Sequence, residues 1–430
     1  MTIFKIKKNL NFNIFKLYYF LPLLLVTGPF LPDLLVSLSS IFFLIYFGFN
    51  EKELFKMQWV CFFLLFYFIL IFTSIFSIFS FVSLKSSLPY LRFLMLVLST
   101  YYLLEKKVLK LNIYYLCLAT LIIILSLDGF MQFITGKNIL GFVSPISYRV
   151  TSFFHDKAVF GSFIFKLIPL FFFLHLVSDN FKYKNFLFKI SLLFSIFAIT
   201  ISGDRSAFYM LIIYITLTTL FFLNKKNLVT SLLVFSIIFL IIYKNDVLKN
   251  RILLMTYEGF FNVLDKFDEI KIKKKIILEN KQIKNINFYI SDDHHNHMLT
   301  AIKIFKEYPL LGSGPNTYRV VCKDQRFYLK PNSCTTHPHN FYLQTLSETG
   351  LLGFIFLFFL FLKTSHFLVF KCLFLPNKKI EYFIYFNFFA ILFPLLPNGN
   401  LLNNWLSILN FLPFGFYLYY FQNKNHFESK

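Results

Sequence analysis

The sequence predicts an all-α polytopic membrane protein with about twelve transmembrane helices and one long loop outside the membrane. Three observations lead to this fold class. Of the 430 residues, 57% are hydrophobic and 21% aromatic, which is unusual for a soluble domain. The apolar residues form repeated runs near the ~20 residues that a helix needs to cross a bilayer. The lysines lie mostly in short gaps between these runs.

Twelve apolar segments follow one another along the chain. The first is preceded by lysines and has no small-residue cleavage site, so we expect a retained span and not a signal peptide. A Gly/Pro-containing break, TGPFLPD, separates the first two, so either could be a hairpin or a tilted span. The predicted spans are 14–30, 32–49, 57–80, 87–104, 112–134, 159–178, 186–202, 207–223, 228–243, 349–370, 381–397 and 400–421.

The basic residues predict the orientation, because cytoplasmic loops are enriched in Lys and Arg. With both termini in the cytoplasm, most lysine groups fall on the cytoplasmic side. The net charge of +22 therefore favours topology signals over a nucleic-acid surface. The short outer loops hold only Lys85, Lys137, Arg149, Lys157 and Arg205.

This topology divides the chain into three predicted parts. Residues 1–243 form an N-terminal bundle of about nine spans, and residues 349–430 form about three C-terminal spans. Between them, residues 244–348 form a long periplasmic loop. Within that loop, ILLMTYEGFFNVL and HMLTAIKIFKEY both have helical periodicity.

Arg205 lies in a short outer turn, SGDRSA, between two apolar segments. A guanidinium beside hydrocarbon is costly unless it reaches water, lipid headgroups or an anionic ligand. One interpretation is an arginine that snorkels to headgroups. The other is a phosphate clamp, because the planar fork fits phosphate oxygens and Gly203 allows close approach.

The long loop carries further cations and two cysteines. Arg319 and Arg326 add positive charge there. Cys322 and Cys334 are the cysteines expected outside the membrane, and an oxidising periplasm would allow them to pair. The spacing alone leaves this disulfide open.

The segment HPHNFYLQTLSETGLLGF places two histidines and an asparagine before a hydrophobic run. In the structural interpretation, Asn340 caps the helix that follows. In the functional one, an imidazole at the helix start acts as an acid or base. A metal pair at His337 and His339, or a cluster over 292–297, has poor ligand spacing, so no metal is expected.

Several blocks resemble the O-antigen ligase family, a superfamily that includes O-antigen polymerases and protein O-oligosaccharyltransferases. HPHNFYLQTLSETGLLG resembles the family signature HxHNxxLxxLxExGxxG and is the most specific block. EYPLLGSGPNTYR, ISGDRSAF and the pair DGFMQFITGKNILGF and RVTSFFHDKAVFGS resemble the segments upstream of it. The family often has an acidic residue near Lys157 and an Arg in place of Lys166, so no function is assigned to either position.

The resemblance implies a GT-C-type glycosyltransferase of the inner membrane with a periplasmic active site and no cofactor. The donor would be a glycan on undecaprenyl pyrophosphate, and the acceptor a hydroxyl of lipid A-core. Arg205 is the first candidate to stabilise the leaving pyrophosphate, followed by Arg319 and Arg149. His339 is the candidate base, because its unperturbed pKa of about 6.5 suits proton transfer near neutral pH.

Asn340 is expected to orient His339, and His337 and Glu348 are weaker candidates for substrate binding. The motifs concern donor handling and leave the acceptor open, so a polymerase or a protein glycosyltransferase remains an alternative to the ligase. A transporter for the same lipid-linked glycan, a different class, would show paired polar residues at mid-bilayer and repeat symmetry. The sequence has neither feature. A structural scaffold is a third alternative.

Overall fold

The computed structural model describes residues 15–45, 52–146, 149–222, 224–257, 292–329, 333–371 and 379–428. Over these residues the chain is helical, and its β-structure is confined to one isolated bridge between Lys137 and Val143. This confirms the all-α prediction for the described part of the chain.

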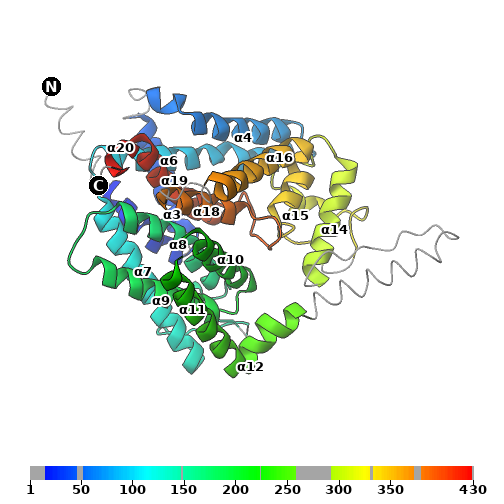
Figure 1. Ribbon diagram of the computed structural model, residues 1–430. Helices are drawn as coiled ribbons and strands as arrows, with labels where there is room; N and C mark the ends of the chain where they lie inside the picture. Colours follow the sequence, from blue (N-terminus) through cyan, green and yellow to red (C-terminus); the bar gives the residue numbers. More distant parts are fainter. Residues whose placement is uncertain are drawn as a thin grey trace.

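The N-terminal half forms a series of long apolar helices (Figure 1). Their bounds are η1 Lys16–Phe20, α2 Leu21–Val26, α3 Phe30–Phe43, η3 Lys52–Lys56, α4 Gln58–Ile75, α5 Ser80–Ser87, η4 Leu88–Tyr90, α6 Leu91–Glu105, α7 Leu111–Thr135, η5 Ser152–Phe154, α8 Phe160–Val177, α9 Lys184–Ile201, α10 Arg205–Phe221 and α11 Lys225–Lys244.

The remaining elements include the helices of the predicted long loop. They are α12 Asp246–Leu248, η6 Lys249–Leu254, α14 Asp292–Glu307, α15 Tyr318–Val321, α16 Phe341–His366, η7 Phe367–Lys371, α18 Lys379–Leu392, α19 Asn404–Gln422 and α20 Lys424–Glu428. Helix α14 confirms the predicted helix in HMLTAIKIFKEY. The other predicted loop helix begins in η6, and its residues 258–264 lie outside the described residues.

Seven helices of the described residues are long and apolar enough to cross a membrane. They are Gln58–Ile75, Ser80–Glu105, Leu111–Thr135, Phe160–Val177, Lys184–Ile201, Lys225–Lys244 and Phe341–Phe370. Three shorter apolar helices occupy Lys16–Val26, Phe30–Phe43 and Arg205–Phe221. With α18 and α19, each of the twelve predicted segments contains a helix, while the number of actual crossings stays a prediction.

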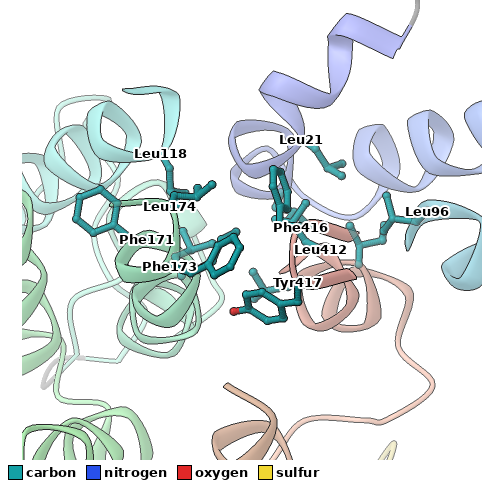
Figure 2. Close-up of a cluster of buried hydrophobic side chains, with 14 of the residues drawn as sticks. Leu21, Leu96, Leu118, Phe171, Phe173, Leu174, Leu412, Phe416 and Tyr417 are labelled. Carbon is teal, nitrogen blue, oxygen red and sulfur yellow. The ribbon is translucent and has the colours of Figure 1, made fainter. Parts of the chain in front are cut away.

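The core forms where α2, α6, α7, α8 and α19 meet (Figure 2). The side chains drawn there lie on all five helices, and α19 packs along α6. The labelled members of this cluster are Leu21, Leu96, Leu118, Phe171, Phe173, Leu174, Leu412, Phe416 and Tyr417. This bundle provides the frame on which the polar outer segments are held.

Two of the predicted motif blocks meet backbone to backbone. The N–H groups of Ser313 and Gly314 donate to the carbonyls of Ser347 and Glu348, at 2.9 and 2.8 Å. Gly350 has φ +63° and breaks α16. Leu351, just after this break, donates to the carbonyl of Pro309 at 2.9 Å.

Glycine is required on both sides of this contact. A Cβ on Gly312 would lie 2.3 Å from the carbonyl carbon of Glu348, and one on Gly350 would lie 2.3 Å from the carbonyl oxygen of Leu310. Both glycines also have positive φ, which other residues adopt only with strain. The glycines of the two blocks therefore serve close backbone packing.

Three predicted span boundaries are wrong. Helix α16 begins at Phe341, eight residues before predicted span 349–370, because Asn340 caps it. The helical segment expected at 87–104 begins at Ser80. Span 381–397 ends at Leu392, since prolines at 394 and 397 interrupt it and the chain turns into a loop that continues to 403.

Cys322 and Cys334 form a disulfide, with their Cα atoms 5.2 Å apart. The bond lies beside a small apolar cluster of α14 and α15 that includes Ile304, Tyr318 and Phe327. The structure therefore contains the disulfide that the cysteine spacing alone could not decide. Cys372 lies outside the described residues.

We predict that Gly312→Ala destabilises the protein more than Gly141→Ala does. Both glycines have positive φ, so each change costs roughly 1–2 kcal/mol in backbone strain. At Gly141 nothing lies within 4 Å of the new Cβ, whereas at Gly312 it meets backbone atoms and adds roughly 1–3 kcal/mol. Thermal unfolding of the purified proteins in one detergent measures both. Equal shifts would contradict the packing argument.

Candidate functional site

The first part of the site lies at the N-terminus of α10. Asp204 caps this helix, accepting the N–H of Ala207 at 3.4 Å, and the guanidinium of Arg149 lies 3.4 Å from the same carboxylate oxygen. The Ser162 hydroxyl donates to the other oxygen of Asp204. Arg205, half-buried, is the first residue of α10. The Asp204 carboxylate thus holds Arg149 next to the turn that carries Arg205.

Helix α8 approaches this turn closely. A Cβ on Gly161 would lie 2.3 Å from Oγ of Ser202 and 3.0 Å from Cβ of Asp204. The backbone N–H of Val150 donates to the carbonyl of Ser202 at 3.2 Å. The segment that carries Arg149 is therefore fixed against the Arg205 turn.

A small cavity of about 50 Å³ opens beside Arg205. Its polar lining consists of Ser162, Lys166, Ser206, Asn387 and Asn398. The space exceeds the ~30 Å³ that one water occupies in the liquid. The ammonium of Lys166 donates to Oδ1 of Asn410 on α19 at 3.1 Å, which adds another positive charge to this side of the site.

The second part of the site is a cluster of four imidazoles before α16. His339 lies at the centre, with ring centroids 4.1 Å from His337, 4.7 Å from His294 and 5.4 Å from His297. The last two lie one turn apart on α14, which packs against α16. Along the described ranges, no three or more His, Cys, Asp or Glu side chains are arranged to hold a metal ion.

The two histidines of the HPHN segment have strongly lowered pKa values. Burial lowers the pKa of His339 to about 3, helped by the neighbouring imidazoles of His337, His294 and His297. Burial also lowers the pKa of His337 to about 4, with Arg319 contributing and the Asn398 carbonyl opposing. The N-terminus of α16 further disfavours a positive charge here. Both rings are therefore neutral at neutral pH.

Asn340 is the N-cap of α16. Its Oδ1 accepts the N–H groups of Tyr342 and Leu343, at 3.0 and 3.1 Å, and its Nδ2 donates to the carbonyl of Pro394 at 2.8 Å. The structural interpretation of this residue is therefore correct. The cap also holds the loop after α18 next to His339.

Glu348 and Arg319 lie where the 312–319 segment meets α16. Glu348 is buried, and its carboxylate accepts the N–H of Tyr318 at 3.1 Å and the amide of Gln344 at 3.0 Å. Arg319 donates to Oδ1 of Asn316 at 2.7 Å. Glu348 thus holds a backbone turn, which places Arg319 near His337.

Asn398 connects the two parts of the site. Its backbone N–H donates to the carbonyl of His339 at 2.9 Å, and the residue also lines the small cavity next to Ser206. Asn400, two residues on, accepts the amide of Gln344 at 2.8 Å. One loop, Phe393 to Asn403, therefore contacts both the imidazole cluster and the cavity beside Arg205.

Residues 190–358 match a family model described as O-antigen ligase. This segment, about two fifths of the chain, is similar to the O-antigen ligase family. The matched segment contains Arg205, the imidazole cluster, Arg319 and Glu348, whereas Arg149 and the Asn398 loop lie outside it. No protein of curated function matches the chain significantly. The enzymes of this family are of the glycosyltransferase type.

The sequence reasoning missed several residues of the site. Asp204 lies within the SGDRSA turn. Its place directly before an arginine and an apolar run is typical of a helix cap. The PNGN stretch at 397–400 is a turn signal between the predicted spans 381–397 and 400–421, and its asparagines carry no role in the prediction. From the sequence, His294 and His297 are candidates only for a metal cluster, because nothing in their spacing places them beside His339.

We predict that acid destabilises the protein through His337 and His339. An unfolded histidine has a pKa of about 6.5, so between pH 6.5 and 4 the unfolded chain binds more protons and the free energy of unfolding falls as the pH falls. The loss at pH 5 is expected to be roughly 1–2 kcal/mol after discounting for partial exposure.

Thermal midpoints between pH 4.5 and 7.5 measure this loss. The double variant His337→Gln/His339→Gln is expected to lose less stability in acid than the unchanged protein, while the exposed His426→Gln should follow the unchanged protein. Identical pH profiles for all three proteins would contradict the assignment.

Proposed function

We propose that this chain is an O-antigen ligase of the bacterial inner membrane. It would transfer a glycan from undecaprenyl pyrophosphate to a sugar hydroxyl of lipid A-core at the periplasmic face. The observation that carries the proposal is the place of Asn398. Its backbone N–H donates to the carbonyl of His339, and the residue also lines the cavity that contains Lys166 and the first turn of α10. A GT-C-type architecture is part of the proposal and is supported by the seven long apolar helices.

The arginines are suited to stabilise the pyrophosphate leaving group. As the bond between the anomeric carbon and the phosphate oxygen breaks, its electron pair moves onto the pyrophosphate, and fixed cations stabilise that charge. Arg205 and Arg149 supply guanidinium groups that fit phosphate oxygens, with Lys166 behind them. Asp204 holds Arg149 in place until the donor arrives.

His339 is suited to act as the base that takes the proton of the acceptor hydroxyl. The acceptor oxygen forms a bond to the anomeric carbon, and its proton passes to the His339 imidazole, which later returns it to water. Only a neutral ring can accept this proton, and burial among imidazoles keeps His339 neutral. A bound pyrophosphate adds negative charge nearby, which favours the imidazolium and raises the pKa of His339 when a stronger base is needed.

The disulfide supports the proposed orientation. Cys322 and Cys334 lie in the segment between α14 and α16, and disulfides persist in oxidising compartments such as the periplasm. The predicted topology places this segment outside the cytoplasm with both termini inside. The two lines of reasoning are independent, because one rests on redox chemistry and the other on loop lysines.

The lipopolysaccharide banding of a strain lacking this protein tests the proposal. We predict that the unchanged gene restores the ladder, while His339→Ala and Arg205→Ala each lower transfer by roughly 10²-fold or more. Arg326→Ala is the control, because that exposed arginine pairs with Asp324 and Glu307 away from the cavity. Membrane levels of each variant are checked by immunoblot.

The banding also separates the acceptor classes. Loss of the ladder, with polymer accumulating on the lipid carrier, supports the ligase. Core carrying a single repeat unit supports a polymerase instead. An unchanged ladder in the deletion strain would overturn the proposal and indicate a protein or capsule acceptor, or a transporter.

We further predict that kcat and kcat/KM depend differently on pH in the acid range. The ratio kcat/KM for the donor reports the free enzyme, in which the pKa of His339 is about 3, so it should be flat between pH 5 and 7. The parameter kcat reports the donor complex, in which the pKa is higher, so kcat should fall toward pH 5. Initial rates at saturating acceptor measure both, and identical pH dependences would contradict a donor-dependent pKa.

A further inference from the structure

A second, larger cavity lies away from the cations, along the side of α7. It is an apolar groove of about 690 Å³ between α2, α7 and the segment before α8. This volume is within the ~300–1,000 Å³ range of ligand pockets. Its lining includes Pro22, Val26, Leu121, Leu125, Leu140 and Phe153.

The groove follows the direction of a candidate membrane span. On α7 its lining runs from Leu116 to Leu125, and at ~1.5 Å per residue this is about 14 Å along the helix axis. These positions are central in Leu111–Thr135, one of the seven candidate spans. The groove therefore runs along the axis of a candidate span, which suits a chain-like apolar ligand.

A turn with an unusual backbone conformation lines one part of the groove. Phe153 and His155 line this part, and the ring of His155 lies 4.0 Å from that of Phe142. Ser152 and His155 have φ values of +51° and +50°, in the left-handed region. Non-glycine residues in this conformation are often found at ligand clamps.

This turn connects the groove to the cation cluster. Arg149 lies four residues before Phe153, so an extended chain of this length spans at most about 14 Å. The turn is held rigidly, because the Gln132 side chain accepts the N–H groups of Thr151 and Ser152, at 2.8 and 2.7 Å. This part of the apolar groove thus lies within reach of a guanidinium that is paired with Asp204.

We infer that the groove holds the first isoprene units of the donor's polyprenyl chain while its pyrophosphate lies at Arg149 and Arg205. This inference rests on the proposed function. Within a bilayer, lipid tails compete for any apolar groove, so burial alone gives little affinity. A ligand with an anionic head and an apolar chain can bind the cations and the groove at the same time. A polyprenyl pyrophosphate has such a head and such a chain.

The first test is photolabelling in vesicles. The probe is a polyprenyl pyrophosphate without glycan that carries a diazirine on an early isoprene unit, and labelled peptides are mapped by mass spectrometry. Leu116→Trp and Ile124→Trp obstruct the groove. Ile113→Trp and Leu127→Trp are matched controls on the same helix but outside the lining, with exposed fractions of 42% and 48% against 41% and 50%.

We predict that the two groove variants reduce labelling of α7 and the 140–155 segment by at least about fivefold, while the controls label normally. An excess of phosphatidylglycerol should not compete. In transfer assays, Leu116→Trp should raise KM about tenfold for a long-chain donor and leave a two-unit donor unchanged, because its chain does not reach residue 116.

The inference is overturned if all four variants label alike, if phosphatidylglycerol competes equally, or if the short donor is affected as strongly as the long one. Labelling requires neither a glycan nor transfer. A chain that labels as expected but transfers nothing would therefore contradict the proposed function alone, and normal transfer without groove labelling would contradict this inference alone.

Discussion

The contact between the Gly312–Gly314 turn and the break of α16 at Gly350 is the constraint on which the rest of the site depends. Two backbone segments meet with no side chain between them, and their N–H and C=O groups pair directly. The break leaves the carbonyls of Ser347 and Glu348, in the turn before Gly350, free to accept hydrogen bonds from outside the helix. It also buries Glu348, whose carboxylate takes the Tyr318 N–H and so fixes Arg319 near the imidazoles.

The connection between α18 and α19 lies outside the motif blocks and links them to the cavity. The imidazoles and the cations lie on different helices, and the Phe393–Asn403 loop contacts both groups. The Pro394 carbonyl of this loop accepts the Asn340 side-chain amide, and the Leu401 N–H donates to Oε1 of Gln344. Because backbone N–H groups define the position of the His339 carbonyl, the loop determines where that ring lies relative to the cavity.

The sequence predicted the helices well, because long apolar runs separated by lysines leave few other folds, and it predicted the cap at Asn340 from residue type alone. It failed where short polar stretches lie within apolar ones. Residues 393–397 were assigned to a span because hydropathy averages over their prolines. His294 was separated from His339 by a long stretch of chain, and only tertiary packing of α14 on α16 brings the two rings to 4.7 Å. Such long-range contacts leave no periodic signal in a single sequence.

The two halves of the site differ in charge for a physical reason. Near α10, the guanidinium of Arg149 pairs with Asp204, and this carboxylate offsets part of the positive charge of that side of the site. Burial and the imidazoles of His337, His294 and His297 lower the pKa of His339, so protonating this ring while the others are close is unfavourable. A proton on His339 is therefore stabilised only when an anion arrives. The lipid-linked pyrophosphate is the anion that the cation cluster would bind, so base strength and donor binding become linked through electrostatics, without any change in conformation.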